Sequence, residues 1–331
     1  MVGEGGGEDN NDPFHNQLDE FWYLKEIDPE YREYIIRVIS NQKRRPIVSD
    51  DNSSIRGLRE LPTSVCMALG GKKVFAKQLN KAWELVYLAF HILDKIEDQE
   101  IDNKLTQYDL GTVTNVTTGL ILQAELILAK LNDRMEKAFG NKSCLLILFN
   151  QLALGVCAGQ HWDLSSSERE LSQAWKVASG KSGNFFALGC KLGAYIATEN
   201  IEQIKKLEEF GHCVGLLLQI ANDVEGLWSQ EEEVSDLLQG KVTIPIAYAL
   251  RVLPERERAV LRDYLNNPAA NAEDDMRAMI IENGALVYLA LEAEKIRQQA
   301  KSILTATALM QTKKDQLELV LERIASFDQR I

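Results

Sequence analysis

The chain has 331 residues, of which 45% are hydrophobic and 26% are charged, and this composition predicts a globular protein with enough apolar material for a core. Its 37 basic and 49 acidic side chains give a formal net charge of −12. Binding to nucleic-acid phosphates requires clustered Lys and Arg, and no long basic stripe is present, so we expect no nucleic-acid partner. An anionic substrate would need a bridging cation.

The chain begins with "MVGEGGGEDNNDP", which is acidic and rich in glycine, whereas a secretory signal is basic and then apolar. We expect residues 1–20 to form a disordered tail and the protein to be cytoplasmic. The cysteines lie singly, without a CxxC spacing, which argues against disulfides and zinc sites. They are Cys66, Cys144, Cys157, Cys190 and Cys213.

Apolar residues recur at spacings of three and four along most of the chain, which predicts helices and no strands. No low-complexity linker divides the chain, so we expect residues 21–331 to form a single all-α domain. The predicted helices cover residues 30–40, 74–98, 112–137, 143–162, 170–197, 201–230, 241–251, 255–265, 285–308 and 314–327.

The helix predicted over residues 74–98 is apolar until its last turns, where the sequence reads "YLAFHILDKIEDQEID". In a helix, Asp94 and Asp98 share one face, with their Cβ atoms about 6 Å apart. Charge runs usually face water. Here the carboxylates follow a buried segment, which favours a site for Mg²⁺, because this hard cation takes carboxylate and phosphate oxygens as ligands.

The most continuous apolar run, "CLLILFNQLALGVCAG" at residues 144–159, is short for a membrane span and is interrupted by Asn150 and Gln151. We interpret it as a core helix and predict no transmembrane segment. A second set of oxygen ligands follows the apolar segment "GLLLQI", where Asn222 and Asp223 begin an acid-rich stretch. A di-iron site is not favoured, because it needs two Glu-x-x-His motifs and only one, Glu209 to His212, is present.

Five motifs, in order, resemble those of the trans-isoprenyl diphosphate synthases and, more broadly, the class I isoprenoid synthases. "DKIED" at 94–98 resembles the first aspartate-rich motif, DDxxD, and "GQHWDL" at 159–164 resembles GQxxDL. "SGKSGNFFALGCKLGA" at 179–194 resembles the Lys-Thr-Gly segment. "LQIANDVEG" at 218–226 resembles the second aspartate-rich motif, and "DLLQGKVTIPIAYAL" at 236–250 resembles DLxxGKxTLPxxYAL.

The resemblance implies an antiparallel helical bundle around a central cavity, a homodimer, and a prenyl diphosphate substrate held by Mg²⁺. It implies that the metal ligands are Asp94, Asp98, Asn222 and Asp223. The resemblance also implies that the catalytic residues are Lys181, Asp94, Asp98 and Asp223.

The resemblance further implies contacts with the substrate's diphosphate from Lys181 and Lys241, and a polar wall containing Gln219 and Gln160. The family's upstream basic motif, GGKRxRP, is represented only by the degenerate "IRGLRELP" at 55–62, or by "QKRRP" at 42–46. Arg56 and Arg59 in the first of these are therefore predicted to contact substrate diphosphate.

Two further departures from the family separate activities within it. Chain-elongating members carry an arginine pair after the first acidic motif, whereas residues 101–119 here contain no arginine. Asn222 and Gly226 replace outer aspartates of the second motif, as in terpene synthases.

The motifs and the departures leave two enzymatic interpretations, and both begin with Mg²⁺-assisted ionisation of an allylic diphosphate. In the first, the prenyl cation is transferred to isopentenyl diphosphate or another acceptor, such as the tryptophan of a pheromone peptide. In the second, a terpene synthase quenches or cyclises the cation. A third interpretation is a catalytically silent subunit of a prenyl diphosphate synthase.

Aromatic rings can stabilise a prenyl cation, although plain core packing is the commoner role of such residues. Phe90 lies one turn before Asp94, where we expect its ring to shorten the cavity for the prenyl tail. The candidates are Trp83, Phe90, Phe185, Phe186 and Trp228.

Overall fold

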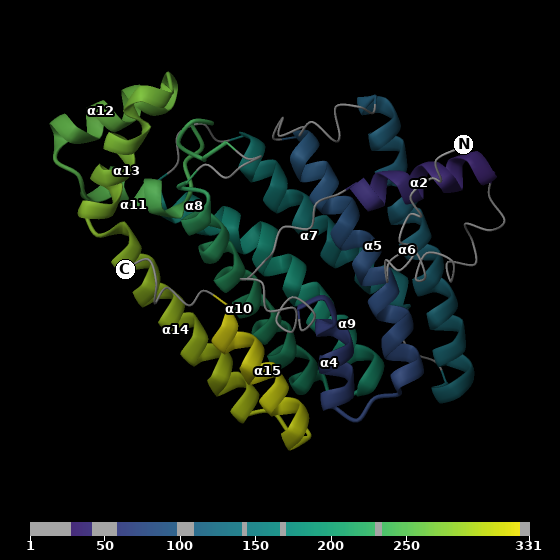
Figure 1. Cartoon of the computed structure of the whole chain (residues 1–331). Coiled ribbons are helices and arrows are strands. Elements are labelled where there is room, and N and C mark those ends of the chain that lie inside the picture. The colour runs from purple at the N-terminus through teal and green to yellow at the C-terminus, as the bar shows by residue number, and fades with distance from the viewer. Residues whose placement is uncertain are drawn as a thin grey trace, which may run out of the picture. The chain divides into compact units, whose positions relative to one another are not determined.

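The computed structural model describes residues 28–41, 58–97, 109–140, 144–165, 170–228 and 234–324, and every regular element within them is helical (Figure 1). This confirms the all-α class predicted from periodicity. The chain divides into two compact units, one comprising residues 1–45 and 85–123 and the other residues 46–84 and 124–331. Two long helices, α5 (Lys73–Glu97) and α6 (Leu110–Phe139), contribute residues to both units.

The first unit contains α2 (Pro29–Asn41), the second half of α5 and the first half of α6. The Asp28 carboxylate accepts hydrogen bonds from the N–H groups of Glu30 and Tyr31, at 2.9 and 3.1 Å, and so caps α2. The Tyr31 hydroxyl donates to the carbonyl of Asn115 at 3.2 Å. Gly119 leaves room for the same hydroxyl, because a methyl group there would overlap it. Tyr31 therefore fixes α2 against α6.

The second unit holds the remaining described helices. They are α4 (Leu61–Ala68), α7 (Leu145–Ser165), α8 (Leu171–Ala178), the π-helical turn η2 (Ser179–Gly183), α9 (Asn184–Ala197), α10 (Ile201–Glu225), α11 (Ile244–Val252), α12 (Glu255–Asn266), the 3₁₀ turn η3 (Ala270–Ala272), α13 (Glu273–Glu282), α14 (Ala285–Thr305) and α15 (Gln311–Arg323). Figure 1 shows α15 beside α14, and α15 also contacts α4.

The core of this unit is built on α9 and α10, and small residues line the contacts of these helices with each other and with α4. Gly193 lies against the main chain of Pro62 in α4, and Gly211 lies against the carbonyl of Phe186. A side chain at either position would force the helices apart, so these glycines permit close helix packing. The Asn200 side chain caps α10 by accepting from the N–H groups of the second and third residues of the helix.

The structure differs from the periodicity analysis in three places. Residues 170–197, expected to form one helix, are divided into α8, η2 and α9. The short helices α4 and α13 lie outside every helix predicted from periodicity. The tail predicted over residues 1–20 falls outside the described residues, and a single domain over residues 21–331 stays a prediction.

One described helical stretch, Leu110–Ala138, is long and apolar enough to cross a membrane by length and composition alone, and 39% of its most apolar part is buried. Core helices of soluble proteins also meet these two criteria. All five cysteines lie in the described ranges, and none of them is paired with another in a disulfide.

Candidate active site

The η2 turn, with the sequence SGKSG, interrupts an otherwise continuous helical stretch between α8 and α9. A π-helical turn widens the helix by one residue, and such turns are concentrated at functional sites because they redirect side chains. Lys181 is the middle residue of this turn. The widened turn therefore sets the direction of the lysine.

Glycines on two neighbouring helices seat the η2 turn. A methyl group on Gly159 of α7 would overlap the main chain of Gly180, and one on Gly215 of α10 would overlap the carbonyl of Ser182. Gly183, in the turn itself, lies against the ring of His212, which is also on α10. The turn thus contacts α7 and α10 through its backbone, and these contacts leave no space for larger residues.

An ion pair joins this turn to α7. The Lys181 Nζ atom lies 2.5 Å from Oδ2 of Asp163, and each side chain is 19% exposed. Gln160 lies one helical turn before Asp163, and its Nε2 is buried without a hydrogen-bond partner in the described part of the chain. A buried amide donor without a partner is unfavourable, so this position suits a ligand that carries acceptor oxygens.

A second chain of hydrogen bonds joins η2 to the end of α10. The Ser182 hydroxyl donates to Oε1 of Gln219 at 2.5 Å, and the Gln219 amide donates to Oδ1 of Asp223 at 2.7 Å. The other oxygen of Asp223 accepts from the backbone N–H of Ile244 at 2.9 Å. Asp223 is therefore held from both sides, at the end of α10 and the start of α11.

The Asp223 carboxyl is 4% exposed, and burial raises its pKa to about 6. The nearby negative charge of Asp163 also raises the pKa, whereas Lys181 and the two hydrogen bonds lower it. Burial is the larger effect, so Lys181 and the two hydrogen bonds do not fully offset the cost of burying the ionised carboxylate. A bound cation would supply that compensation, because opposite charge favours the ionised form.

The donors in this cluster fit Mg²⁺, which is bound by one or two carboxylates together with water and phosphate oxygens. Asp163 and Asp223 offer carboxylate oxygens, and Lys181 offers a positive charge suited to a phosphate. No group of three or more His, Cys, Asp or Glu side chains with metal-site geometry occurs in the described ranges. The cluster is thus suited to a metal shared with a phosphate-bearing ligand, because that ligand would complete the coordination.

The structure brings together three of the residues singled out from sequence, Lys181, Gln219 and Asp223. Asn222 is half-buried beside them, and its carbonyl accepts from the N–H of Gly226 at 2.7 Å. Lys241 is half-buried in the segment that leads to Ile244, and its N–H donates to the carbonyl of Asp236 at 2.9 Å.

The other predicted residues are not placed in the cluster. Asp94 and Phe90 are half-buried on the part of α5 that belongs to the first unit. Arg59 is half-buried just before α4. Asp98 and Arg56 lie outside the described residues. The predicted roles of these five residues stay predictions.

Three of the aromatic candidates form a buried cluster in the second unit. The Trp83 ring stacks on Phe185, with 4.1 Å between ring centroids, and meets Phe186 edge to face at 5.9 Å. All three are less than 8% exposed. Their mutual contacts agree with the core-packing interpretation.

Sequence reasoning missed two residues of this region. Asp163 is the aspartate of "GQHWDL", a motif from which only Gln160 had been selected, so the signal was present in the sequence. His212, which had been considered only for an iron site, places its Nε2 atom 2.9 Å from the Ser179 hydroxyl in η2. Burial lowers the His212 pKa, and the neighbouring Glu208 opposes that shift.

Carboxylates and a lysine gathered at a widened turn of a helical fold form a site suited to an anionic, phosphate-bearing ligand. The chain matches the Polyprenyl synthetase family over residues 54–282, more than half of its length, and it belongs to that family. This confirms the resemblance seen in the motifs. The chain is therefore an all-α transferase of isoprenoid biosynthesis, a prenyltransferase.

Two relatives and one solved structure illustrate the similarity. The chain is 29% identical to a geranylgeranyl diphosphate synthase of Sulfolobus acidocaldarius over 248 residues, 70% of this chain and 74% of that protein. It is 27% identical to the tryptophan prenyltransferase ComQ of Bacillus subtilis subsp. natto over 208 residues, 62% of each chain. A geranylgeranyl pyrophosphate synthase from Corynebacterium glutamicum, solved with isoprenyl diphosphate and magnesium, shares the fold. Its TM-score is 0.70 at 17% identity, over 94% of this chain and 96% of the other.

Proposed function

We propose that this prenyltransferase ionises an allylic prenyl diphosphate and transfers the prenyl group to isopentenyl diphosphate or to another acceptor. The observation that carries the proposal is the cluster of Lys181, Asp163 and Asp223 around the η2 turn. A diphosphate leaves readily only when its growing negative charge is stabilised in a site shielded from water. Lys181 is held in place for that role by Asp163 and by the seated turn.

The chain's carboxylates would hold Mg²⁺ against the diphosphate. We assign Asp223 and Asn222 at the end of α10 and Asp163 on α7 to this role, and we assign it to Asp94 and Asp98 on the strength of the motif resemblance. When bound, Mg²⁺ supplies positive charge to the diphosphate oxygens. The raised pKa of Asp223 and the oxygen-rich donor set support this assignment.

Polar and basic side chains would orient the diphosphate. We assign Gln160 and Gln219 as polar wall residues, and the unpartnered Nε2 of Gln160 supports a contact with a substrate oxygen. Lys241, Arg56 and Arg59 are assigned contacts with diphosphate on the strength of the motif resemblance. The half-buried Phe90 would limit the length of the prenyl tail.

The acceptor defines the second part of the proposal. One relative is named as a diphosphate synthase and the other as a tryptophan prenyltransferase, which supports either isopentenyl diphosphate or an indole as acceptor. Family membership favours transfer over cyclisation or quenching by water, and over a catalytically silent subunit. The missing arginines in residues 101–119 favour an acceptor without a second diphosphate, because a diphosphate-bearing acceptor needs cations to hold it.

Product analysis tests the proposal. The purified chain is incubated with Mg²⁺ and allylic diphosphates of several lengths, with and without isopentenyl diphosphate or an indole peptide, and products are identified by mass spectrometry. We expect a prenylated acceptor and no product from Asp94→Asn, a near-isosteric variant checked for folding by its melting temperature. Phe90→Ala should accept longer tails. A hydrocarbon or alcohol formed without acceptor would instead establish a terpene synthase.

We further propose that the enzyme is a cytoplasmic homodimer that associates through α7, and that α6 is a bundle helix. One face of α7 exposes Ile147 (59%) and Leu154 (69%), with the small Ala158 one turn further on. Large exposed apolar side chains on one helix face are typical of an interface. The cysteines lie singly in the sequence, without a CxxC spacing, and this pattern supports a reducing compartment.

A further inference from the structure

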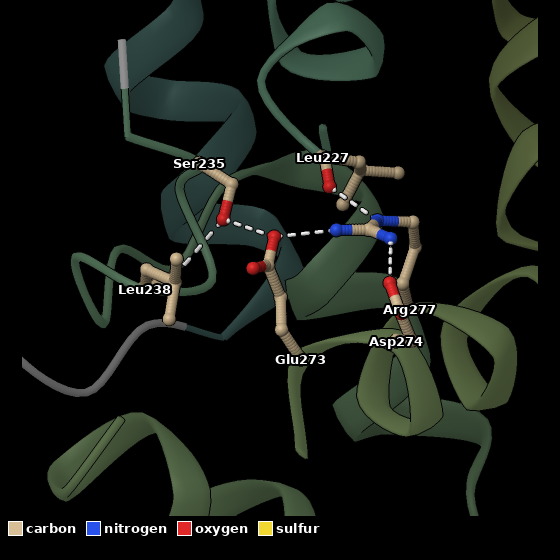
Figure 2. Close-up of polar contacts among 6 residues, drawn as sticks. All are labelled: Leu227, Ser235, Leu238, Glu273, Asp274 and Arg277. Atoms are coloured by element: carbon tan, nitrogen blue, oxygen red, sulfur yellow. Dashed lines mark hydrogen bonds and ion pairs between the residues drawn. The ribbon is translucent and has the colours of Figure 1, made fainter. Parts of the chain in front are cut away.

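A buried polar cluster lies on α13, where the proposed mechanism uses no residue. Arg277 donates from Nε to the carbonyl of Leu227 at 2.7 Å, from one terminal nitrogen to the Glu273 carboxylate, and from the other to Asp274 at 2.5 Å. The same Glu273 oxygen accepts from the Ser235 hydroxyl at 2.7 Å. Figure 2 shows Glu273 between Ser235 and Arg277, with Leu227 above the guanidinium and Asp274 below it.

The cluster joins two segments that are separate in sequence. Leu227 lies two residues after the end of α10, the helix that carries Asp223. Ser235 lies in the return segment, residues 234–243, which leads to α11. The Ser235 hydroxyl also accepts from the N–H of Leu238 at 3.2 Å, so the start of the return segment is fixed internally. Arg277 and Glu273 therefore hold both segments to α13.

Asp274 is exposed at the surface, whereas the rest of the cluster is largely removed from water. The Arg277 and Glu273 side chains are 14% and 11% exposed, and Ser235 and Leu227 are 1% and 0% exposed. A guanidinium with five donors in a fixed plane can bind a carbonyl and two carboxylates at once, and a lysine cannot. Removing the guanidinium would leave the buried Glu273 charge without its partner, which is strongly unfavourable.

The held segments carry groups of the proposed site. The carbonyl of Gly226 accepts from the N–H of Asp236 at 2.8 Å, and the carbonyl of Asp236 accepts from the N–H of Lys241. Three residues later the N–H of Ile244 binds Asp223. The path from Arg277 to Asp223 thus runs through the end of α10 on one side and through the return segment on the other.

We infer that Arg277 and Glu273 are positioning residues: they fix the end of α10 against the return segment, so that Asp223 and Lys241 keep the spacing needed for a metal-bound diphosphate. The inference rests on the proposed function for its link to turnover. A purely structural role would predict the same ligand affinity for any two variants that are equally destabilised. A positioning role predicts weaker ligand binding when Arg277 or Glu273 is changed than when a residue away from the site is changed.

Arg297 on α14 provides a matched control. It is 12% exposed and also binds two backbone carbonyls, those of Leu321 at 3.3 Å and Ile324 at 3.0 Å, together with the Glu294 carboxylate. These three partners lie on α14, on α15 and at the residue that follows α15. Arg297→Met removes the same chemical group from a similar environment without touching the proposed site.

The test compares Arg277→Met, Arg277→Lys, Glu273→Gln and Arg297→Met in the full chain, well below their melting temperatures. We expect Arg277→Met to weaken Mg²⁺-dependent binding of inorganic pyrophosphate about tenfold, as loss of supporting contacts does at metal sites, and to raise the Mg²⁺ concentration for half-maximal turnover. Backbone amides of residues 222–228 and 241–244 should exchange faster. Glu273→Gln should act in the same direction, and Arg277→Lys should be intermediate.

Arg297→Met should lower the melting temperature while leaving binding and exchange in these segments unchanged. Pyrophosphate affinity within about twofold of wild type in Arg277→Met, or an equal loss in Arg297→Met, would overturn the inference. If the wild-type chain shows no turnover, the proposed function fails, and the exchange and pyrophosphate measurements still decide the positioning role.

Discussion

At the scale of single residues, the ion pair between Lys181 and Asp163 couples a cation to the carboxylates of the cluster. Lys181→Met removes that cation and leaves the Asp163 carboxylate mostly shielded from water without its partner. Because preorganised charge at a leaving group typically contributes two to three orders of magnitude to rate, we expect kcat/KM to fall by about a hundredfold or more. Steady-state kinetics with the preferred allylic diphosphate measures the change.

Lys176→Met is the control for that substitution. Lys176 lies on the same helical stretch, is exposed, and places its Nζ atom 3.9 Å from the centre of the Trp162 ring. Because Lys176 is exposed and its amino group lies over the Trp162 ring, the kinetics of Lys176→Met should stay within about twofold of wild type, as is usual for surface substitutions. Equal losses in both variants would contradict the assigned role of Lys181.

His212 makes a second prediction at this scale, for stability against pH. Burial lowers its pKa in the folded chain, whereas the unfolded chain protonates this histidine at about 6.5. Between the two values the unfolded chain binds more protons, so the free energy of unfolding decreases as pH falls below about 6.5. The raised pKa of Asp223 acts in the opposite direction between about 4 and about 6, so the two effects partly cancel in the wild type.

The difference between wild type and His212→Gln isolates the histidine. Urea unfolding across this pH range should give a smaller loss of stability toward acid in His212→Gln than in wild type. The glutamine keeps an amide that can bond the Ser179 hydroxyl, which limits structural change. Parallel pH curves for the two proteins would show that His212 titrates alike in the folded and unfolded chains.

The sequence motifs single out Lys181, Gln219 and Asp223, and the structure places these three residues together, while their roles stay predictions. Sequence reasoning missed Asp163, because the contact with Lys181 depends on how α7 meets a widened helix turn. Sequence spacing specifies neighbours on one helix and says little about which of several polar side chains reaches across to another.

At the scale of elements, the glycines of α7 give a matched pair of substitutions. Gly159→Ala would push a methyl group into the main chain of Gly180, whereas Gly155→Ala meets only the Asn184 amide, at 3.5 Å. Alanine is favoured over glycine within helices by about 1 kcal/mol. We expect Gly155→Ala to be neutral or stabilising and Gly159→Ala to destabilise by about 1–3 kcal/mol, the range for overpacked cores.

Because η2 carries Lys181, Gly159→Ala should also lower kcat/KM. The kinetics are measured well below the melting temperature, where unfolding of the variant does not account for the loss. Thermal melts and kinetics of the two variants provide the comparison. If Gly159→Ala retained wild-type stability and kinetics, the close approach of α7 and η2 would not be a constraint on the site.

The long helices were predictable because each carries an apolar face over many turns, as in α10 and α14. The helices α4 and α13, of 8 and 10 residues, were missed. Helices this short are marginal by themselves and depend on packing, such as that of Pro62 in α4 against Gly193. The η2 turn was missed as well, since SGKSG fits a regular helix pattern and the residues that pack closely on the turn, Gly159 and Gly215, are distant in sequence.

At the scale of the whole molecule, the exposed face of α7 predicts self-association. The face runs through Ile147, Gln151, Leu154 and Ala158, which recur at spacings of three and four and are all exposed. In a twofold dimer each such residue occurs twice in the interface, so one substitution acts on both chains.

Burial of a leucine side chain contributes about 1.5–3 kcal/mol, and two copies together correspond to a change of about a hundredfold or more in the dissociation constant. We therefore expect the wild-type chain to sediment as a dimer and Leu154→Glu, which adds a charge to each copy, to sediment as a monomer at the same concentration. Leu291→Glu, on α14 and likewise exposed at 59%, should leave the dimer intact. A wild-type chain that stays monomeric at all concentrations would contradict the dimer. A dimer that survives Leu154→Glu would place the interface elsewhere, because an apolar interface cannot accommodate two unpaired buried carboxylates.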